Sequence, residues 1–314
     1  MTNFENGIAS FGFPVIGSSG YISVRAAANK QIYFVDGTSG NDGNTGKSVD
    51  AATKTIQKAV DKCSNDLGGY VFIGEGVYSE QVTVTKRGIH LIGMGAGRTI
   101  LRYASPTTIS SYDGVSPMII VAPEYSAGKP MGVEIANMTV GGNGGYSGIY
   151  IGDGSNGAQA SYTYVHNCIL DGANLEGQYG IVIRGGSYIQ IHNNMITSWL
   201  LANVVIDSGL TRTAYYNEVI GNRIVGGGVG IALNDTANSN FIIGNYLLDA
   251  STNALGSTIA VTAVLGGACV GTDNCIAGNY DLSGGTEATL GASDWMAGNY
   301  KASAGNGSVY VSEA

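Results

Sequence analysis

The sequence predicts an all-β fold in which one chain winds into a parallel β-helix, a solenoid of short stacked strands. A phrase of two or three strand-forming residues, a Gly or His, and then an Asn occurs six times, ending at Asn167, Asn193, Asn222, Asn245, Asn279 and Asn299. The steps between these asparagines are 26, 29, 23, 34 and 20 residues, and self-similarity in this range is typical of stacked structural units. The composition agrees, since 50 glycines beside 44% hydrophobic residues favour turns between ordered strands.

The elements follow in a simple order. A strand is expected at residues 31–36, and one capping helix at about 50–64, where Ile56, Ala59, Val60 and Cys63 share an apolar face. Asp50 is placed to cap the start of this helix, and Gly68-Gly69 follow its end. A helix laid across the first coil would cover the open strand edges of the solenoid.

Short β-branched strands separated by Gly or Asn run from Tyr70 onward. We expect eight to ten coils and, at about 4.8 Å per coil, a rod of roughly 40–50 Å. The sequence shows no Pro/Ser-rich linker. It therefore predicts one β-helix domain over residues 29–300, an N-terminal arm over 1–28 and a short C-terminal tail over 301–314.

The N-terminal arm is apolar without a helical or alternating period. Its apolar residues are Phe4, Ile8, Phe11, Phe13, Val15 and Ile16, interleaved with Gly and Ser. Two interpretations stay open: an extended arm that attaches to another protein surface, or a segment that folds back to cap its own solenoid.

Charge is sparse and uneven. Charged residues make up 12% of the chain, and the net charge of −8 falls entirely on residues 140–314, because residues 1–139 are balanced. A nucleic-acid groove needs the opposite sign, so nucleic acid is not an expected partner. The start of the chain lacks the basic and apolar regions of a secretory signal, and no stretch reaches 18 apolar residues, so no membrane insertion is expected.

No cofactor or metal is expected. Cys63 and Cys168 lie in apolar phrases and are predicted core residues, whereas a local disulfide between Cys269 and Cys275 is left open. The loop from Asp36 to Asp42 has oxygen ligands for Ca²⁺, but lacks EF-hand spacing, which favours a loop of side-chain-stabilised turns.

Residues 31–101 resemble the start of the pectate-lyase-like, right-handed parallel β-helix superfamily. The matching pieces are Tyr33-Phe34-Val35-Asp36-Gly37, the helix Thr55-Ile56-Gln57-Lys58-Ala59-Val60, and Gly74-Glu75-Gly76-Val77-Tyr78-Ser79-Glu80. The last piece is also similar to the first motif of pectin methylesterases. The opening from Met1 to Gly20, leading into Tyr33-Phe34-Val35-Asp36, is similar to that of bacteriophage virion-associated proteins with this fold. The resemblance implies a right-handed solenoid.

Catalytic residues are not defined by the sequence. The later signatures of pectin methylesterases are absent, so Tyr78 and Glu80 are predicted to close the first coil. Weak candidates for lyase chemistry are Arg184, Glu176 and Asp207. His166 and His192 occupy the Gly position of the repeat and are predicted turn residues. Tyrosines recur near strand ends, and they could form either a subunit interface or a surface that stacks on glycans. The candidates are Tyr150, Tyr162, Tyr188 and Tyr215.

Two kinds of function follow from these observations. The first is a structural protein of a bacteriophage virion, a homotrimer that decorates the particle surface like a cement protein. Its arm would dock on the major capsid protein or another virion protein. The second is a tailspike-type, carbohydrate-active β-helix, either a polysaccharide lyase or hydrolase, or a spike that binds host-surface glycan without cleaving it.

Overall fold

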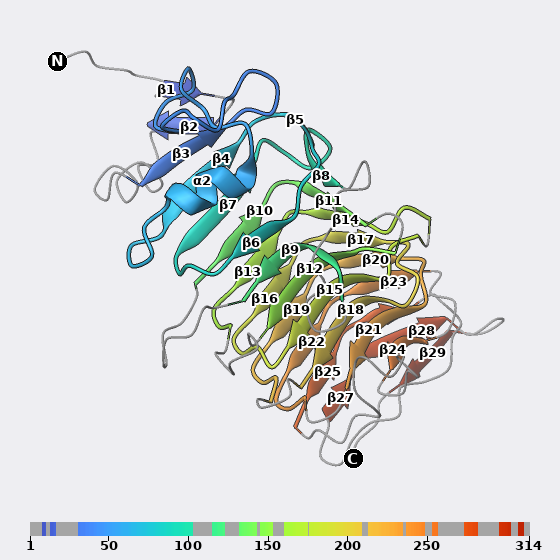
Figure 1. Cartoon of the computed structure of the whole chain (residues 1–314). Coiled ribbons are helices and arrows are strands. Elements are labelled where there is room, and N and C mark those ends of the chain that lie inside the picture. Colours follow the sequence, from blue (N-terminus) through green and yellow to red (C-terminus); the bar gives the residue numbers. More distant parts are fainter. Residues whose placement is uncertain are drawn as a thin grey trace.

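The chain winds into a stack of parallel coils (Figure 1). The stack runs from α2 (Ile56–Lys62) and β3 (Ile32–Val35) at one end to β27 (Trp295–Ala297) and β28 (Asn299–Ala302) at the other. The computed structural model describes residues 8–10, 13–16, 31–102, 115–122, 132–142, 145–152, 160–174, 176–208, 213–234, 237–248, 253–256, 273–281, 295–302 and 307–310. Three sheets line the coils, and every described strand pair in them is parallel except the last pair of the second sheet. The predicted parallel β-helix is thereby confirmed.

Among the described residues the first sheet has ten strands, which corresponds to the upper end of the expected number of coils. Its strands are β3 (Ile32–Val35), β4 (Gly69–Ile73), β7 (Ile89–Gly93), β10 (Glu134–Ala136), β13 (Tyr164–His166), β16 (Gln190–His192), β19 (Glu218–Ile220), β22 (Phe241–Ile243), β25 (Cys275–Ala277) and β27 (Trp295–Ala297).

The second sheet also has ten strands, and its last pair, β28 with β29, is antiparallel. Its strands are β5 (Gly76–Tyr78), β8 (Thr99–Arg102), β11 (Thr139–Gly141), β14 (Ile169–Asp171), β17 (Met195–Thr197), β20 (Arg223–Val225), β23 (Tyr246–Leu248), β26 (Tyr280–Asp281), β28 (Asn299–Ala302) and β29 (Gly307–Tyr310). The segment predicted as a tail after residue 300 therefore includes part of β28 and all of β29.

The third sheet has seven strands and carries apolar side chains on both faces. Its strands are β6 (Val82–Val84), β9 (Pro117–Val121), β12 (Ser147–Gly152), β15 (Tyr179–Arg184), β18 (Ala202–Asp207), β21 (Val229–Leu233) and β24 (Asn253–Gly256). One face lines the interior of the coils; the other contributes Ile120, Val182 and Val205 to a second buried cluster.

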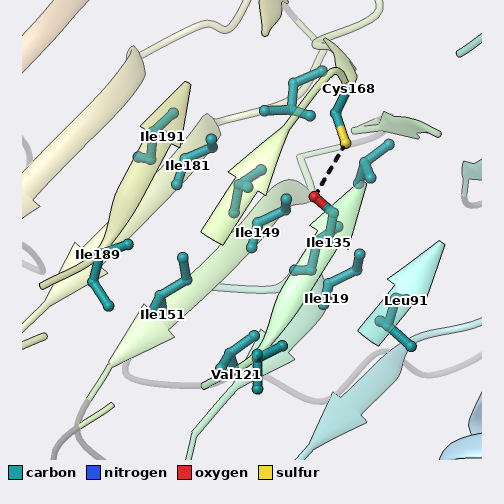
Figure 2. Packing of buried hydrophobic residues seen from close by; sticks show 14 of the residues in the cluster. Leu91, Ile119, Val121, Ile135, Ile149, Ile151, Cys168, Ile181, Ile189 and Ile191 are labelled. Carbon is teal, nitrogen blue, oxygen red and sulfur yellow. Dashed lines mark hydrogen bonds between the residues drawn. The ribbon is translucent and has the colours of Figure 1, made fainter. Parts of the chain in front are cut away.

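The interior is a continuous column of aliphatic side chains. In the first sheet, Leu91, Ile135 and Val165 occupy one register position in successive coils, and each is fully buried. Alternation along a strand turns the middle residue of each three-residue strand inward. Figure 2 shows Cys168 in this column, where its thiol donates to the Ile135 carbonyl at 3.7 Å. Burial raises the pKa of Cys168 to about 12. Cys63 is also buried, so both predicted core cysteines are confirmed.

The repeat is offset by one residue from the predicted alignment. Asn167 and Asn193 have φ values of 53° and 56°, and Gly221 and Gly244 have 66° and 65° at the equivalent turn. Glycine and asparagine are the residues that adopt this left-handed conformation most readily. His166 and His192 instead end strands β13 and β16. Their predicted assignment to the Gly position was wrong. Asn167 and Asn193 occupy the position that Gly221 and Gly244 occupy in later coils, one residue after the histidines.

The residue after the left-handed turn forms a buried asparagine ladder. Asn194, Asn222, Asn245, Asn279 and Asn299 follow one another along the stack, each with its side-chain oxygen accepting from the preceding member. Each of the last four also donates its amide to a strand carbonyl, as Asn222 does to Ile191 at 2.7 Å. A second ladder contains Asn217, Asn240 and Asn274. Both ladders bind consecutive coils through buried polar groups.

The capping helix α2 is shorter than expected and spans Ile56–Lys62. Its N-cap is Thr55 rather than Asp50, because the helix begins at Ile56 and the Thr55 hydroxyl accepts from the Lys58 backbone N–H. Glu80 also accepts from the backbone N–H groups of Ile56 and Gln57. At the other end, Lys86 donates to the carbonyls of Val60, Asp61 and Cys63. Opposite charges therefore hold the two ends of the helix, as its dipole requires.

The arm was predicted to be extended. Within it the structure describes two strands, β1 (Ile8–Ser10) and β2 (Phe13–Ile16), which pair antiparallel. The described part of the arm is therefore an antiparallel strand pair. Phe4 and Phe11 lie outside the described residues.

Candidate functional site

Arg184 and Asp207 come together, but Glu176 does not join them. The two are partners in the register between β15 and β18, and Arg184 Nε lies 3.8 Å from Asp207 Oδ2. Their side chains are 10% and 0% exposed. Glu176 is exposed in the turn before β15, so the length of that strand, roughly 16 Å at 3.3 Å per residue, separates it from Arg184. The three residues do not form a shared catalytic constellation.

Tyr78 and Glu80 are structural, as predicted. The Tyr78 hydroxyl donates to the Gly74 carbonyl at 3.1 Å and accepts from the Gly37 N–H at 3.2 Å, and burial raises its pKa to about 12. Glu80 holds the N-terminus of α2, and burial raises the pKa of its carboxyl against the lowering effect of those N–H groups. Both side chains are engaged in closing the first coil.

The Asp36–Asp42 loop is held by its own side chains. Asp36 accepts from the backbone of Thr38 and Ser39, and Asp42 accepts from the backbone of Lys54 and Thr55. These contacts support the predicted interpretation of turns stabilised by side chains. Within the described parts of the chain, no three His, Cys, Asp or Glu side chains are placed to hold a metal ion.

All three histidines of the chain lie on the outer face of the first sheet, and each contacts a glutamate. Glu134 Oε2 lies 2.6 Å from His90 Nδ1, and Glu134 Oε1 lies 2.8 Å from His166 Nε2. Glu134 thereby connects β7, β10 and β13. Asn167 Nδ2 lies 3.1 Å from His166 Nδ1. An amide donor there leaves the ring proton on Nε2, facing Glu134. No local pattern in the sequence indicates this cluster, because its members come from different coils.

This cluster predicts a pH-dependent contribution to stability. Hydrogen bonds from His166 and His90 lower the pKa of Glu134 to about 2. A carboxyl whose pKa is lower in the folded state than in the unfolded state stabilises the fold. For Glu134 the stabilisation is fully present at pH values above the unfolded pKa, near 4.5, and is lost as the pH falls toward 2. We expect Glu134→Gln to lower the unfolding free energy by about 1–2 kcal/mol at pH 6 and progressively less below pH 4. Urea titrations at several pH values measure this.

The control for that experiment is Glu75→Gln. Glu75 pairs with Arg98 at 2.6 Å, but both side chains are more than half exposed. An exposed pair contributes little, so this variant is expected to follow the wild-type pH profile. A Glu134→Gln deficit that stays constant down to pH 2.5 would contradict the linkage to the Glu134 carboxyl.

A second feature is a column of tyrosines at one corner of the coils. Tyr162 and Tyr188 stack with centroids 5.0 Å apart and planes at 5°, and Tyr188 and Tyr216 follow at 5.4 Å and 28°. All three have left-handed backbone, with φ of 56°, 57° and 55°. A bulky residue in this conformation costs roughly 1 kcal/mol, and such strain gathers at functional sites. The three tyrosine side chains are exposed, so the strained backbone positions carry aromatic rings that face the solvent.

Two of the four candidate tyrosines belong to this column, and a third borders it. Tyr215 is half-buried and meets Tyr188 and Tyr216 edge to face. Tyr150 differs: its side chain is fully buried in the cluster behind the third sheet. We therefore remove Tyr150 from the candidate surface. The sequence shows that strand β12 is apolar, but it does not show that both faces of the third sheet are buried.

A third feature is an exposed aromatic surface over the last coils, which we call the distal aromatic face. It comprises Phe241, Cys275 and Trp295 on the first sheet and Tyr246 and Tyr280 on the second. Tyr246 and Tyr280 stack with centroids 5.6 Å apart and planes at 5°. This surface was not predicted from the sequence, although the uncharged residues that open β22, β25 and β27 were a usable signal.

Together these observations define the class of protein: a right-handed parallel β-helix with aromatic side chains exposed along its coils. A solved structure described as XylC in complex with xylose shares this fold, at 12% identity over 86% of this chain and 68% of the other, with a TM-score of 0.53. Pectin methylesterase from Aspergillus niger aligns at 15% identity over 87% and 86% of the two chains, with a TM-score of 0.47. ORF18 of Geobacillus virus E2 aligns at 14% identity over 90% and 63%, with a TM-score of 0.42.

The model of one protein family matches part of the chain. It is the family described as periplasmic copper-binding protein (NosD), and it matches residues 123–262, less than half of the chain. No curated protein matches the chain in sequence. Among the described residues, no helix has the length and apolar character needed to cross a membrane.

Proposed function

We propose that the protein is a structural component of a bacteriophage particle surface: a homotrimer of β-helical rods, attached to the particle by its N-terminal arm. The observation that carries the proposal is the distal aromatic face. Large aromatic side chains remain exposed in register along the axis of the rod, and such rows suit lateral packing of parallel rods better than they suit solvent.

The rigidity of the rod supports a mechanical role. One continuous aliphatic column runs through the coils, and two buried asparagine ladders connect the later coils, from Asn194 and Asn217 onward. The sequence of the arm supports its role in attachment, because it is apolar and similar to the opening of virion-associated β-helix proteins. The proposal places this arm on the capsid and the acidic half of the chain away from it.

A glycan-binding or carbohydrate-active spike is the second candidate, and the tyrosine column favours it. Parallel exposed rings offer flat apolar surface with hydroxyl groups at the edge, which suits stacking on sugar rings. Cleavage is less well supported than binding, because the paired Arg184 and Asp207 are buried and Glu176 is distant from them.

Copper binding is not part of the proposal. The family model that suggests it covers residues 123–262, but the described residues within that range contain no group of three or more His, Cys, Asp or Glu side chains placed to hold a metal ion. The histidines there are His166 and His192, and each contacts a glutamate instead.

Deletion of residues 2–20 tests the attachment. We expect the truncated chain to fold, since the coils begin at β3, and to lose binding to purified particles from which the native protein has been removed. The control is Tyr188→Ser in the full chain, which alters an exposed side chain far along the sequence from the arm. Undiminished binding of the truncated chain would contradict docking by the arm, and absence of the protein from purified particles would contradict the virion role.

A further inference from the structure

The outer face of the first sheet divides into two parts. From β10 to β19 its outward positions include the charged or polar residues Glu134, His166, His192 and Glu218, and the apolar ones are Ala136 and Ile220. From β22 to β27 they are uncharged: Phe241 and Ile243, then Cys275 and Ala277, then Trp295 and Ala297. Register places these residues in line with Glu218 and Ile220, so the change occurs within one coil.

The uncharged part continues around a corner onto the second sheet. Only Gly244 and Asn245 separate β22 from β23, which brings Tyr246 beside this face, and Tyr280 follows it in the next coil. Phe241 is 39% exposed, Trp295 54%, Tyr246 37% and Tyr280 41%. The distal aromatic face is therefore one patch that wraps two sheets.

We infer that the distal aromatic face is the surface through which copies of this chain contact one another. The argument for a second copy is electrostatic. Residues 140–314 carry a net charge of −8, so identical halves repel wherever their carboxylates meet. Among the described outward positions of β22, β25 and β27 there is no charged side chain. Two identical chains can meet over these first-sheet positions without bringing like charges together, whereas on the second sheet Arg223 lies 5.9 Å from the centre of the Tyr246 ring.

Geometry also favours parallel copies. Tyr246 and Tyr280 lie one coil apart, and Phe241 and Trp295 lie two coils apart with Cys275 between them. The coil spacing that sets these intervals, about 4.8 Å, is the same in every copy. Parallel rods in register thus present matching rows along their whole contact. Buried aromatic rings at the centre of an interface contribute most to its affinity. The inference rests on the homotrimer of the proposed function and identifies the face that forms it.

The test compares the wild-type chain with the double variant Phe241→Ser, Trp295→Ser by light scattering during chromatography. We expect a mass of three chains of 32.2 kDa for the wild type and of one chain for the variant. The control is Tyr162→Ser, Tyr188→Ser, which removes two equally exposed rings from the tyrosine column and is expected to stay trimeric.

Cys275 gives a second measurement that needs no variant. It lies between Phe241 and Trp295 in the register and is half-buried, whereas Cys63 and Cys168 are buried. Its alkylation, followed by peptide mass spectrometry, is expected to slow at least tenfold when the wild-type concentration is raised from the monomeric to the trimeric range.

The outcomes separate the inference from the proposed function. A trimeric wild type with a trimeric double variant, or with unprotected Cys275, overturns the assignment of this face and leaves the homotrimer standing. A monomeric wild type overturns both the inference and the homotrimer, but not attachment by the arm, which the particle-binding assay decides separately.

Discussion

Asn222→Ala is expected to lower the free energy of unfolding by about 3–5 kcal/mol. The Asn222 side chain donates to Ile191 at 2.7 Å and to Asn245 Oδ1 at 3.0 Å, and it accepts from the backbone and the side-chain amide of Asn194 at 2.9 and 3.1 Å. It is 1% exposed, so truncation leaves buried donors and acceptors without partners and without water. Each such group costs about 1–3 kcal/mol.

The matched control is Asn193→Gly, in the preceding coil, at the turn position directly before the ladder residue Asn194. Asn193 is exposed and has φ of 56°, a conformation that glycine adopts without strain. We expect a change within about 1 kcal/mol. Urea unfolding followed by circular dichroism measures both variants, and equal effects at the two positions would show that the ladder hydrogen bonds contribute little.

Gly142→Ala is expected to lower the free energy of unfolding by about 3 kcal/mol through overpacking. Trp199 is fully buried among glycines, and a Cβ at Gly142 would lie 2.2 Å from Trp199 Cζ3 and 2.7 Å from the Tyr146 carbonyl oxygen. Neither the indole nor the backbone can move without disturbing the neighbouring coil, where Trp199 Nε1 donates to Leu170. Thermal unfolding and the tryptophan emission maximum report the change.

Gly141→Ala is the control for this variant. At Gly141 the nearest atom to an added Cβ is Arg102 Cβ at 3.3 Å, on a side chain that faces solvent. A small shift accommodates the methyl group, so we expect an effect below about 1 kcal/mol. Similar losses for both variants would argue against tight packing around Trp199 as the cause.

Much of the fold could be predicted because it is local in the sequence. The repeated phrase, the short β-branched strands and the apolar face of Ile56, Ala59 and Val60 depend on residues within one coil. The offset in the repeat shows the limit of this approach. Asn193 and Asn194 have the same side chain, but one takes a left-handed turn at the surface and the other joins a buried ladder. Only stacking against the next coil distinguishes them.

The candidate sites were harder to predict because they join residues from different coils. Glu134 lies 44 residues from His90 and 32 from His166, and a strand register brings them into contact. Tyr150 and Tyr188 look alike in sequence, yet one is buried behind the third sheet and the other stands in the exposed column.

The sequence by itself determined the stacking of short parallel strands, the position of the capping helix near Ile56, the buried state of Cys63 and Cys168, and the acidity of the second half. The tertiary structure decided which side chains meet across coils: the asparagine ladders, the His–Glu cluster, the tyrosine column and the distal aromatic face. The physical reason is the register between strands. Coils of unequal length place residues 20 to 44 positions apart side by side, and no local pattern specifies which of them pair.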